Sequence, residues 1–525
     1  MANITNQPEW LDNAVFYEIY PQSFCDSNGD GIGDINGIIS KLDYIKGLGC
    51  NAIWMNPCFD SPFKDGGYDV RNYYKVAERY GTNDDLVRLF EEAHKLGIKI
   101  LLDLVPGHTS EEHEWFQQSK KIEQNEFSSR YIWTKSVFEG AQPLPFIAGE
   151  AERNGCYVLN YFKCQPALNY GFYQPNQPWQ EGVDGPNAVK TREAMADVIR
   201  FWLKLGADGF RVDMADSLVK LDGPNKEGTV HVWQEILGPI HEEYPEAAFV
   251  SEWNNPSQAL RAGFDMDFFL EWRGNGYSTM MRDFDETPDG EVISPNGGYF
   301  AKHSGSDVSR FLKDYLPKYE DTKDLGLYCF ITCNHDMLRP TAGLSNDELR
   351  LAYAWIYTMP GAPFLYFGDE LALPQRLLRT KEGSYRRTGA RAPMQWNAGK
   401  NKGFSTTDGE LYLPVDPSEN APTVEAQEND PASMLNFVRG LIALRQNNAD
   451  LGNYSPFAVY SAEEGSRVFA YKRGELLVAM NPGVDTEELM LDGSYESIYA
   501  LGVSVIRDDK LTLGSQSFVV LRPIN

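Results

Sequence analysis

Short apolar segments of strand length recur along the chain, and most of them are followed by segments with helical periodicity. The stretch 82–97 shows the helical signals, because it opens with the capping residue Thr82 and closes on Gly97. Alternating strands and helices predict a parallel sheet, and eight such units predict a (β/α)₈ TIM barrel. The eight predicted strands cover residues 15–20, 51–55, 99–105, 209–213, 248–252, 265–269, 327–332 and 363–367.

Two regions break this rhythm. Residues 109–187 delay the helix after the third strand and are rich in Pro, Asn, Gln and aromatic residues, which is typical of an irregular inserted subdomain. Beyond residue 453 the chain alternates between apolar and polar positions, for example over 467–472, as antiparallel strands do. We therefore expect a barrel over 1–108 and 188–452, an inserted subdomain over 109–187, and a C-terminal all-β domain, a β-sandwich, over 453–525.

The charge of the chain narrows its partners. With 75 acidic and 48 basic residues, the formal net charge is -27, a field that repels phosphate backbones and anionic lipid surfaces. We expect neither nucleic acid nor a membrane as partner, whereas a neutral, hydroxyl-rich molecule meets no such repulsion. The N-terminal residues lack the pattern of a signal peptide, and no stretch is apolar for long enough to span a bilayer. These features favour a cytoplasmic enzyme.

Seven cysteines are present, an odd number with no CxxC pair. This pattern argues against a zinc ribbon and against a disulfide framework. We expect buried free thiols.

Acidic and histidine side chains stand where several predicted strands end. The third strand runs into His108, the fourth ends with Arg211 and Asp213, the fifth ends with Glu252, and the seventh leads to His335 and Asp336. A single Asp after a strand is more often a helix cap, and a single His is usually structural. However, the C-terminal ends of barrel strands converge on one cleft, so these side chains together indicate an active site.

These segments resemble those of the α-amylase superfamily, glycoside hydrolase family thirteen. The resemblance extends over essentially the whole predicted barrel. It is carried by residues 14–24, 67–70, 103–108, 165–169, 209–213, 252, 334–336 and 359–370.

The resemblance implies a retaining mechanism in which Asp213 is the nucleophile, Glu252 the general acid/base, and Asp336 a stabiliser that orients sugar hydroxyls. The residue types fit these roles. Arg211, two residues before Asp213 on the same strand face, is expected to lower the pKa of that carboxyl. Glu252 must keep its proton, which requires burial and no cationic partner, and the neighbouring Trp253 is compatible with that.

The resemblance also implies a set of side chains around the sugar that is cleaved. Among them, Arg391 is expected to pair with Asp69 and to close the pocket around a non-reducing end, although a surface salt bridge is the alternative for this arginine. The substrate-binding set is Tyr68, Asp69, His108, Arg211, His335 and Arg391.

Oxygen-bearing side chains alternate with glycines directly after the first predicted strand, as in the start of an EF-hand loop. Related loops bind Ca²⁺ or Mg²⁺, and we expect a structural ion here, while a purely turn-forming loop is the alternative. The predicted ligands are the side chains of Asp26, Asn28, Asp30 and Asp34 and the carbonyl of Ile32.

Two departures from the family pattern bear on specificity. Gly107 stands where many amylases have an asparagine that binds a second calcium, so we expect that site to be absent. Endo-acting amylases often carry Lys-His shortly after the nucleophile, whereas this chain reads Met214-Ala215-Asp216. The second departure favours an exo-acting enzyme for short oligosaccharides.

The sequence thus predicts a retaining α-glucosidase that cleaves α-linked gluco-oligosaccharides from the non-reducing end. The linkage, α-1,4 or α-1,6, stays open. One alternative is a transglycosylase or isomerase, because a sugar hydroxyl can intercept the same intermediate, and another is an endo-acting α-amylase. A non-catalytic carbohydrate-binding scaffold on the same barrel is a third.

Overall fold

The computed structural model describes residues 7–287, 290–294, 297–379, 382 and 385–524. Eight parallel strands form one sheet in the order β13-β10-β9-β8-β5-β2-β1-β14. A parallel bridge between Ile331, just past β13, and Phe364 in β14 brings the two edges together. The predicted TIM barrel is confirmed. Its strands are β1 (Phe16–Ile19), β2 (Ala52–Met55), β5 (Lys99–Leu104), β8 (Gly209–Val212), β9 (Ala248–Ser251), β10 (Met266–Phe269), β13 (Leu327–Phe330) and β14 (Phe364–Tyr366).

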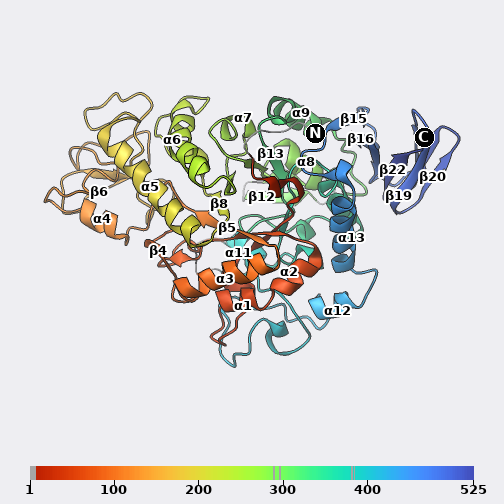
Figure 1. Cartoon of the computed structure of the whole chain (residues 1–525), viewed down its shortest axis with the longest axis horizontal. Coiled ribbons are helices and arrows are strands. Elements are labelled where there is room, and N and C mark those ends of the chain that lie inside the picture. The colour runs from red at the N-terminus through yellow and green to blue at the C-terminus, as the bar shows by residue number, and fades with distance from the viewer. Residues whose placement is uncertain (1–6, 288–289, 295–296, 380–381, 383–384, 525) are drawn as a thin grey trace.

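Helices follow most of these strands and surround the barrel (Figure 1). The predicted helix at 82–97 is α3 (Asn83–Lys95), and it begins with a capping box in which Thr82 and Asp85 satisfy each other's backbone N–H groups. The others are α1 (Ile35–Ile39), α2 (Leu42–Leu48), α5 (Pro186–Leu205), α6 (Glu227–Glu243), α7 (Pro256–Ala259), α8 (Gly276–Met281), α9 (Ser309–Thr322), α10 (Asn346–Ile356), α11 (Tyr385–Thr388), α12 (Val424–Glu428) and α13 (Met434–Gln446).

The barrel interior is aromatic at its centre. The rings of Phe16 and Phe364 stack with centroids 4.1 Å apart, and Phe268 meets Phe364 edge to face at 4.8 Å. Every residue of β1 and β2 is buried, so both faces of these strands are covered, as expected for parallel strands between a packed interior and a ring of helices. The rigid interior fixes the directions in which side chains leave the strand ends.

The segment between β5 and α5 has little regular structure, as the sequence indicates. It contains α4 (Glu114–Ser119) and a two-stranded sheet of β6 (Phe146–Ala148) and β7 (Cys156–Val158), with a small apolar cluster of its own. A further short sheet pairs β3 (Phe59–Asp60) with β4 (Asn72–Val76) in the loop after β2. In Figure 1 the inserted segment and the C-terminal sheets lie at opposite ends of the molecule.

The C-terminal region is all-β, with one five-stranded and one three-stranded antiparallel sheet. Strand β17 shows how they stack. Leu477 and Ala479 belong to a cluster shared with the three-stranded sheet, whereas Leu476, Val478 and Met480 belong to the main core. Alternate side chains thus bury both faces of the strand. The strands are β15 (Phe457–Ser461), β16 (Phe469–Arg473), β17 (Leu476–Asn481), β18 (Glu487–Met490), β19 (Tyr495–Leu501), β20 (Ser504–Arg507), β21 (Lys510–Leu513) and β22 (Ser517–Pro523).

Three further features complete the fold. A hairpin of β11 (Asp283–Thr287) and β12 (Gly290–Ser294) follows α8, where we predicted no strand. All seven cysteines are free, and six of them are buried, Cys164 being partly exposed. Within the described ranges, no helix combines the length and apolarity that a membrane crossing requires.

Candidate active site

Arg211 is the centre of the site. It lies on β8 in register with Asp103 on β5, and its buried guanidinium contacts three carboxylates. Nη1 lies 2.8 Å from Asp103 Oδ1 and 3.0 Å from Asp213 Oδ1, and Nη2 lies 2.8 Å from Glu252 Oε2. Two of the predicted catalytic acids are therefore brought onto one cation. Strand order explains this, since β8 is flanked by β5 and β9, the strands that end beside Asp103 and Glu252.

The backbone after each acid adopts the left-handed conformation at a residue other than glycine. Met214 has φ 42°, and its N–H donates to Glu252 Oε2 at 3.0 Å. Asn254, two residues after Glu252, has φ 59°. The buried Asp267 on β10 accepts hydrogen bonds from the N–H groups of Trp253 and Asn254 and holds this turn. Such strained residues persist where their surroundings over-determine them, as at functional sites.

The electrostatics of Asp213 and Glu252 differ from our expectation. Burial raises the pKa of Asp213 well above its ordinary value, with Glu252, Asp103 and Asp336 adding to the rise, although Arg211 lowers it. The expected lowering is therefore outweighed, because one guanidinium serves three carboxylates in a site with little water. Glu252 was expected to lack a cationic partner, yet it contacts Arg211.

Asp336 lies in a cationic setting. Its Oδ1 contacts Arg391 Nη2 at 2.7 Å and Arg387 Nη1 at 3.0 Å, and its Oδ2 lies 3.3 Å from His335 Nε2. Burial opposes its ionisation, but His335 and the two arginines outweigh it, so the pKa of Asp336 is held well below its ordinary value. The side chain keeps 35% exposure, so a ligand can reach it.

His335 stacks against two aromatic rings. Its plane is within 11° of those of Tyr20 and Tyr68, at centroid distances of 6.0 and 5.3 Å. Nδ1 lies 2.9 Å from Glu18 Oε1, and Nε2 lies 2.6 Å from Tyr68 Oη, whose hydroxyl donates to Asp103 at 3.0 Å. Burial would lower the pKa of His335, but Asp336 and Glu18 together raise it to about 9.

His108 is buried and neutral. Burial lowers its pKa to about 3. With the proton on Nε2, it donates to the carbonyl of Tyr68 at 3.1 Å, and Nδ1 accepts from Asn160 Nδ2 at 3.1 Å. Both ring nitrogens thus have protein partners, and a sugar hydroxyl would have to replace one of them.

The predicted pair of Asp69 with Arg391 is wrong. Asp69 accepts hydrogen bonds from the hydroxyl of Ser61 and from the N–H groups of Lys64 and Asp65. These bonds fix the turn that leads to Tyr68, and burial raises the pKa of Asp69 to about 6.

Two arginines, Arg391 and Arg387, contact Asp336 in place of the predicted pair. Arg391 contacts Glu382 and Asp336, and it is fully buried and so not in a surface salt bridge. Arg387 on α11 reaches Asp65 at 2.5 Å as well as Asp336. The bridge across this end of the site is therefore Asp65–Arg387–Asp336.

The loop 26–34 is held by its own hydrogen bonds. Asp26 accepts from the N–H groups of Asn28, Gly29 and Gly31, Asn28 from that of Asp30, and Asp30 from that of Ile32, while Asp34 caps α1 by accepting from Gly37. Gly31 has φ 91°, and a Cβ there would lie 2.6 Å from the carbonyl oxygen of Glu410. Among the described side chains, no group of three His, Cys, Asp or Glu residues is arranged to hold a metal ion. The ion stays a prediction.

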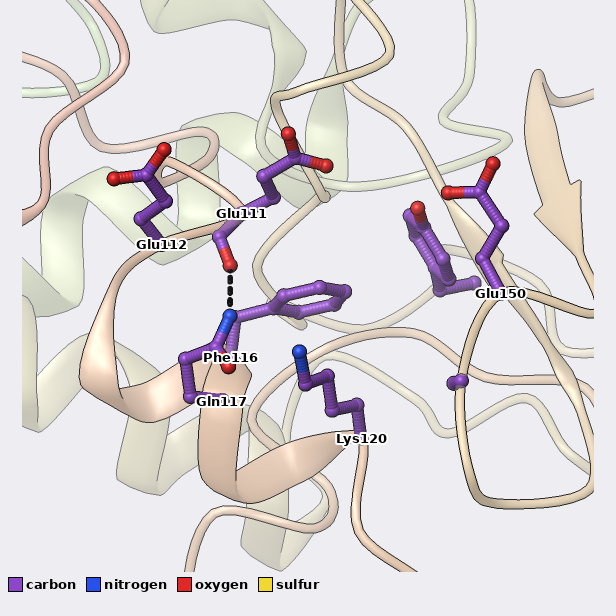
Figure 2. A pocket seen from close by; sticks show the side chains of 8 residues that line it. Glu111, Glu112, Phe116, Gln117, Lys120 and Glu150 are labelled. Carbon is purple, nitrogen blue, oxygen red and sulfur yellow. Dashed lines mark hydrogen bonds between the residues drawn. The ribbon is translucent and has the colours of Figure 1, made fainter. Parts of the chain in front are cut away.

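A hollow of about 260 Å³ lies on the inserted segment. Figure 2 shows Lys120 and Phe116 on one side of it and Glu150 on the other. Its carboxylates have partners outside the hollow, because Glu111 and Glu112 contact Lys64 and Glu150 contacts Lys163. None of the predicted site residues lines it, so the candidate active site is defined by the strand-end carboxylates and not by this hollow.

Sequence reasoning missed four residues of the site, namely Glu18, Asp65, Asp103 and Arg387. Two of them carried a signal. Glu18 is a charged residue inside an apolar strand, and Asp103 lies near the end of the third strand, much as Asp213 ends the fourth. Arg387 lies on the short helix α11, in a stretch of sequence where no periodicity indicates the direction of a side chain.

Comparison of the sequence with known proteins identifies related families and enzymes. A model of the α-amylase catalytic domain matches residues 18–453. A trehalose synthase/amylase of Mycobacterium tuberculosis is 33% identical over 515 residues, covering 90% of this chain and 80% of the relative. An oligo-1,6-glucosidase of Heyndrickxia coagulans is 33% identical over 497 residues, covering 84% of this chain and 85% of the relative.

Solved structures agree. An inactive double mutant of MutB in complex with isomaltulose superposes with a TM-score of 0.80 at 25% identity, covering 98% of this chain and 99% of the other. A mutant isomaltulose synthase of Erwinia rhapontici in complex with sucrose gives a TM-score of 0.79 at 26% identity, covering 98% of this chain and all of the other. The chain therefore belongs to the α-amylase family, glycoside hydrolase family thirteen, whose enzymes hydrolyse or transfer the glycosidic bonds of oligosaccharides.

Proposed function

We propose that this enzyme is a retaining α-glucosidase that removes glucose from the non-reducing end of short α-linked gluco-oligosaccharides. The observation that carries the proposal is the pairing of Asp213 and Glu252 on the single guanidinium of Arg211. A retaining mechanism needs two carboxyl groups close together, one to attack and one to donate a proton. A shared cation brings them together.

In the proposed reaction the two acids hold one proton between them. Glu252 donates it to the glycosidic oxygen while Asp213 attacks the anomeric carbon, so the bond to the leaving sugar breaks as the bond to Asp213 forms. Burial raises the pKa of Asp213, and the charges of Glu252, Asp103 and Asp336 add to the rise, so we propose that the buried pair keeps one proton. Water, deprotonated by Glu252, then releases glucose with its configuration retained.

Asp336 supplies a fixed negative charge. Because its pKa is held well below the ordinary value, it is ionised throughout the working range of pH. We propose that it accepts hydrogen bonds from sugar hydroxyls and stabilises the positive charge that develops on the ring. Tyr68, His108 and His335 complete the proposed binding site for the cleaved sugar.

Action at chain ends is supported by the bridge Asp65–Arg387–Asp336. Arg387 joins the loop after β2 to the loop after β13, and Gln165 of the inserted segment donates to Asp65 at 2.8 Å. Three segments thus meet beside Asp336. We propose that these contacts close this end of the site, which would leave no path for a chain that continues beyond the cleaved sugar.

A sugar hydroxyl can replace water in the second step, which would make the enzyme a transglycosylase or isomerase. This second candidate is favoured by the names of its relatives, a trehalose synthase/amylase and an isomaltulose synthase. The proposed chemistry of Asp213 and Glu252 is the same in both cases, and the acceptor decides the product.

One experiment separates these candidates. Maltose, isomaltose, panose, trehalose, sucrose and soluble starch are offered side by side at low and high concentration, and all products are identified. Release of glucose from short substrates supports the α-glucosidase, whereas longer or rearranged disaccharides as main products support a transferase. Rapid cutting inside starch chains would overturn the proposal of end action.

We also propose a structural cation in the loop after β1. The donor set is entirely oxygen, from Asp26, Asn28, Asp30 and Asp34 and the carbonyl of Ile32, which suits a hard ion such as Ca²⁺ or Mg²⁺. The ion would stabilise a loop that contacts residues far along the chain, since Ser405 donates to Asp26. It takes no part in the chemistry.

A further inference from the structure

Glu18 is a carboxylate inside the barrel that the proposed reaction does not use. It lies in the middle of β1, is fully buried, and its Oε2 has no hydrogen-bond partner among the described residues. Burying a carboxylate in an apolar interior is costly unless a partner compensates. Its Oε1 has two partners, His335 Nδ1 at 2.9 Å and Asn56 Nδ2 at 3.2 Å.

We propose that Glu18 is a positioning residue for His335, fixing the orientation of the ring and keeping it in the doubly protonated form. With Nδ1–H bound to Glu18, the Nε2–H can only point toward Tyr68 and Asp336. The ring stacks against those of Tyr20 and Tyr68, which restricts its rotation toward other partners. Glu18 thereby aims a charged donor at the place proposed for the sugar hydroxyls.

The charges around His335 support this assignment. Glu18 faces it from β1 and Asp336 from its own loop, while Asp103 on β5 lies behind the hydroxyl of Tyr68. Two cations lie near the same group and oppose the effect of these negative charges on His335. Arg391 donates to the carbonyl of His335, and Arg211 lies over the ring of Tyr68. Only Glu18 and Asp336 touch the ring nitrogens among these charged groups, and the pKa of about 9 follows from them.

The inference rests on the proposed function for its effect on activity, but not for its structural core. The charge of His335 can be followed without any substrate, by NMR of the full-length protein carrying ¹⁵N-labelled histidine. Glu18→Gln keeps the shape of the side chain and removes the charge. We expect the titration midpoint of His335 to fall by about one unit or more.

Glu370→Gln is the matched control. Glu370 is also fully buried, its Oε2 also lacks a described partner, and it is tied to β1 through Tyr17, the neighbour of Glu18, on the opposite face of the strand. It does not contact His335. This variant makes the same carboxyl-to-amide change at a second buried site, although burial raises the pKa of Glu370 to about 7. It is expected to change stability while leaving the titration of His335 where it is in the wild type.

The kinetic effect follows from the same geometry. If His335 binds hydroxyls more tightly in the transition state, Glu18→Gln lowers kcat about tenfold and changes KM less than threefold. An unchanged His335 midpoint in Glu18→Gln, or an equal shift in Glu370→Gln, would overturn the proposal. A shifted midpoint in a protein that cleaves no glucoside would instead uphold the role of Glu18 and refute the proposed function.

Discussion

Arg387 offers a sharp test of the closed pocket. Arg387→Met keeps the bulk of the side chain and removes its charge. It leaves Asp65 with Gln165 as its remaining side-chain donor, at 2.8 Å, and leaves Asp336 with Arg391 and His335. The change therefore removes two charge-assisted hydrogen bonds but leaves neither carboxylate without a partner.

The size of the effect can be worked from the exposure of the partners. Breaking a buried ion pair costs about 3–5 kcal/mol. Here the arginine side chain is 13% exposed and that of Asp336 is 35% exposed, so water compensates part of the loss. We expect the free energy of unfolding to fall by about 1–2 kcal/mol. For activity, one lost contact to Asp336 and an opened pocket lower kcat/KM on disaccharides about 30- to 100-fold, which is roughly 2–2.7 kcal/mol.

The assay combines urea unfolding with kinetics on maltose, isomaltose and a maltoheptaose substrate. Arg261→Met is the control, because Arg261 makes a two-bond pair with Asp321 at 2.8 and 2.9 Å, but both side chains are about half exposed. That variant is expected to lose less than about 1 kcal/mol and no activity. The closed pocket is refuted if Arg387→Met keeps its disaccharide kcat/KM within twofold of the wild type, or if the variant loses activity equally on short and long substrates.

Two further predictions concern the acid pair and the loop. Asp213→Asn lowers turnover by about 10⁴-fold or more. Because folding raises the pKa of Asp213, ionisation of this side chain opposes folding as pH rises, so the Tm of the variant should equal or exceed that of the wild type, increasingly above about pH 4. A lower Tm of the variant at pH 7 would contradict this. Added Ca²⁺ should raise the Tm of the wild type but not that of Asp30→Asn, and the wild type should gain about 2.7 kcal/mol in its free energy of unfolding at a hundredfold excess of Ca²⁺ over Kd. Equal Tm values of the wild type with Ca²⁺ and with a chelator would refute the proposed ion.

The barrel could be predicted because its signals are local. Each strand is a short apolar run between polar segments, and all eight predicted runs became strands with ends within about two residues. The hairpin of β11 and β12 escaped prediction, because Asp283–Thr287 contains two aspartates and a glutamate and lacks the apolar alternation of a half-buried strand.

The candidate site was only partly accessible from the sequence. Asp213, Glu252 and Asp336 could be found because strand ends converge in a barrel. Their partners could not, since which carboxylate an arginine meets depends on loops whose path the sequence does not encode locally. We predicted an arginine partner for Asp69, but the aspartate that contacts an arginine is Asp65. The two aspartates are only four residues apart in one turn, yet they face different neighbours.

The predicted lowering of the pKa of Asp213 was wrong for a related reason. Sequence proximity showed one arginine two residues away, but not that Asp103 and Glu252 share it. One cation among three carboxylates cannot hold all of them ionised in a buried site.

The most direct test of the central claim is to trap the glycosyl-enzyme. The Glu252→Gln variant is incubated with 5-fluoro-α-glucosyl fluoride, whose leaving group needs no acid, and is then digested and mapped by mass spectrometry. The account predicts a single 5-fluorohexosyl adduct on the peptide that contains Asp213, in an ester bond to that side chain, with the anomeric fluoride released. An adduct on another residue, or turnover of the wild type with inverted configuration and no adduct, would contradict it.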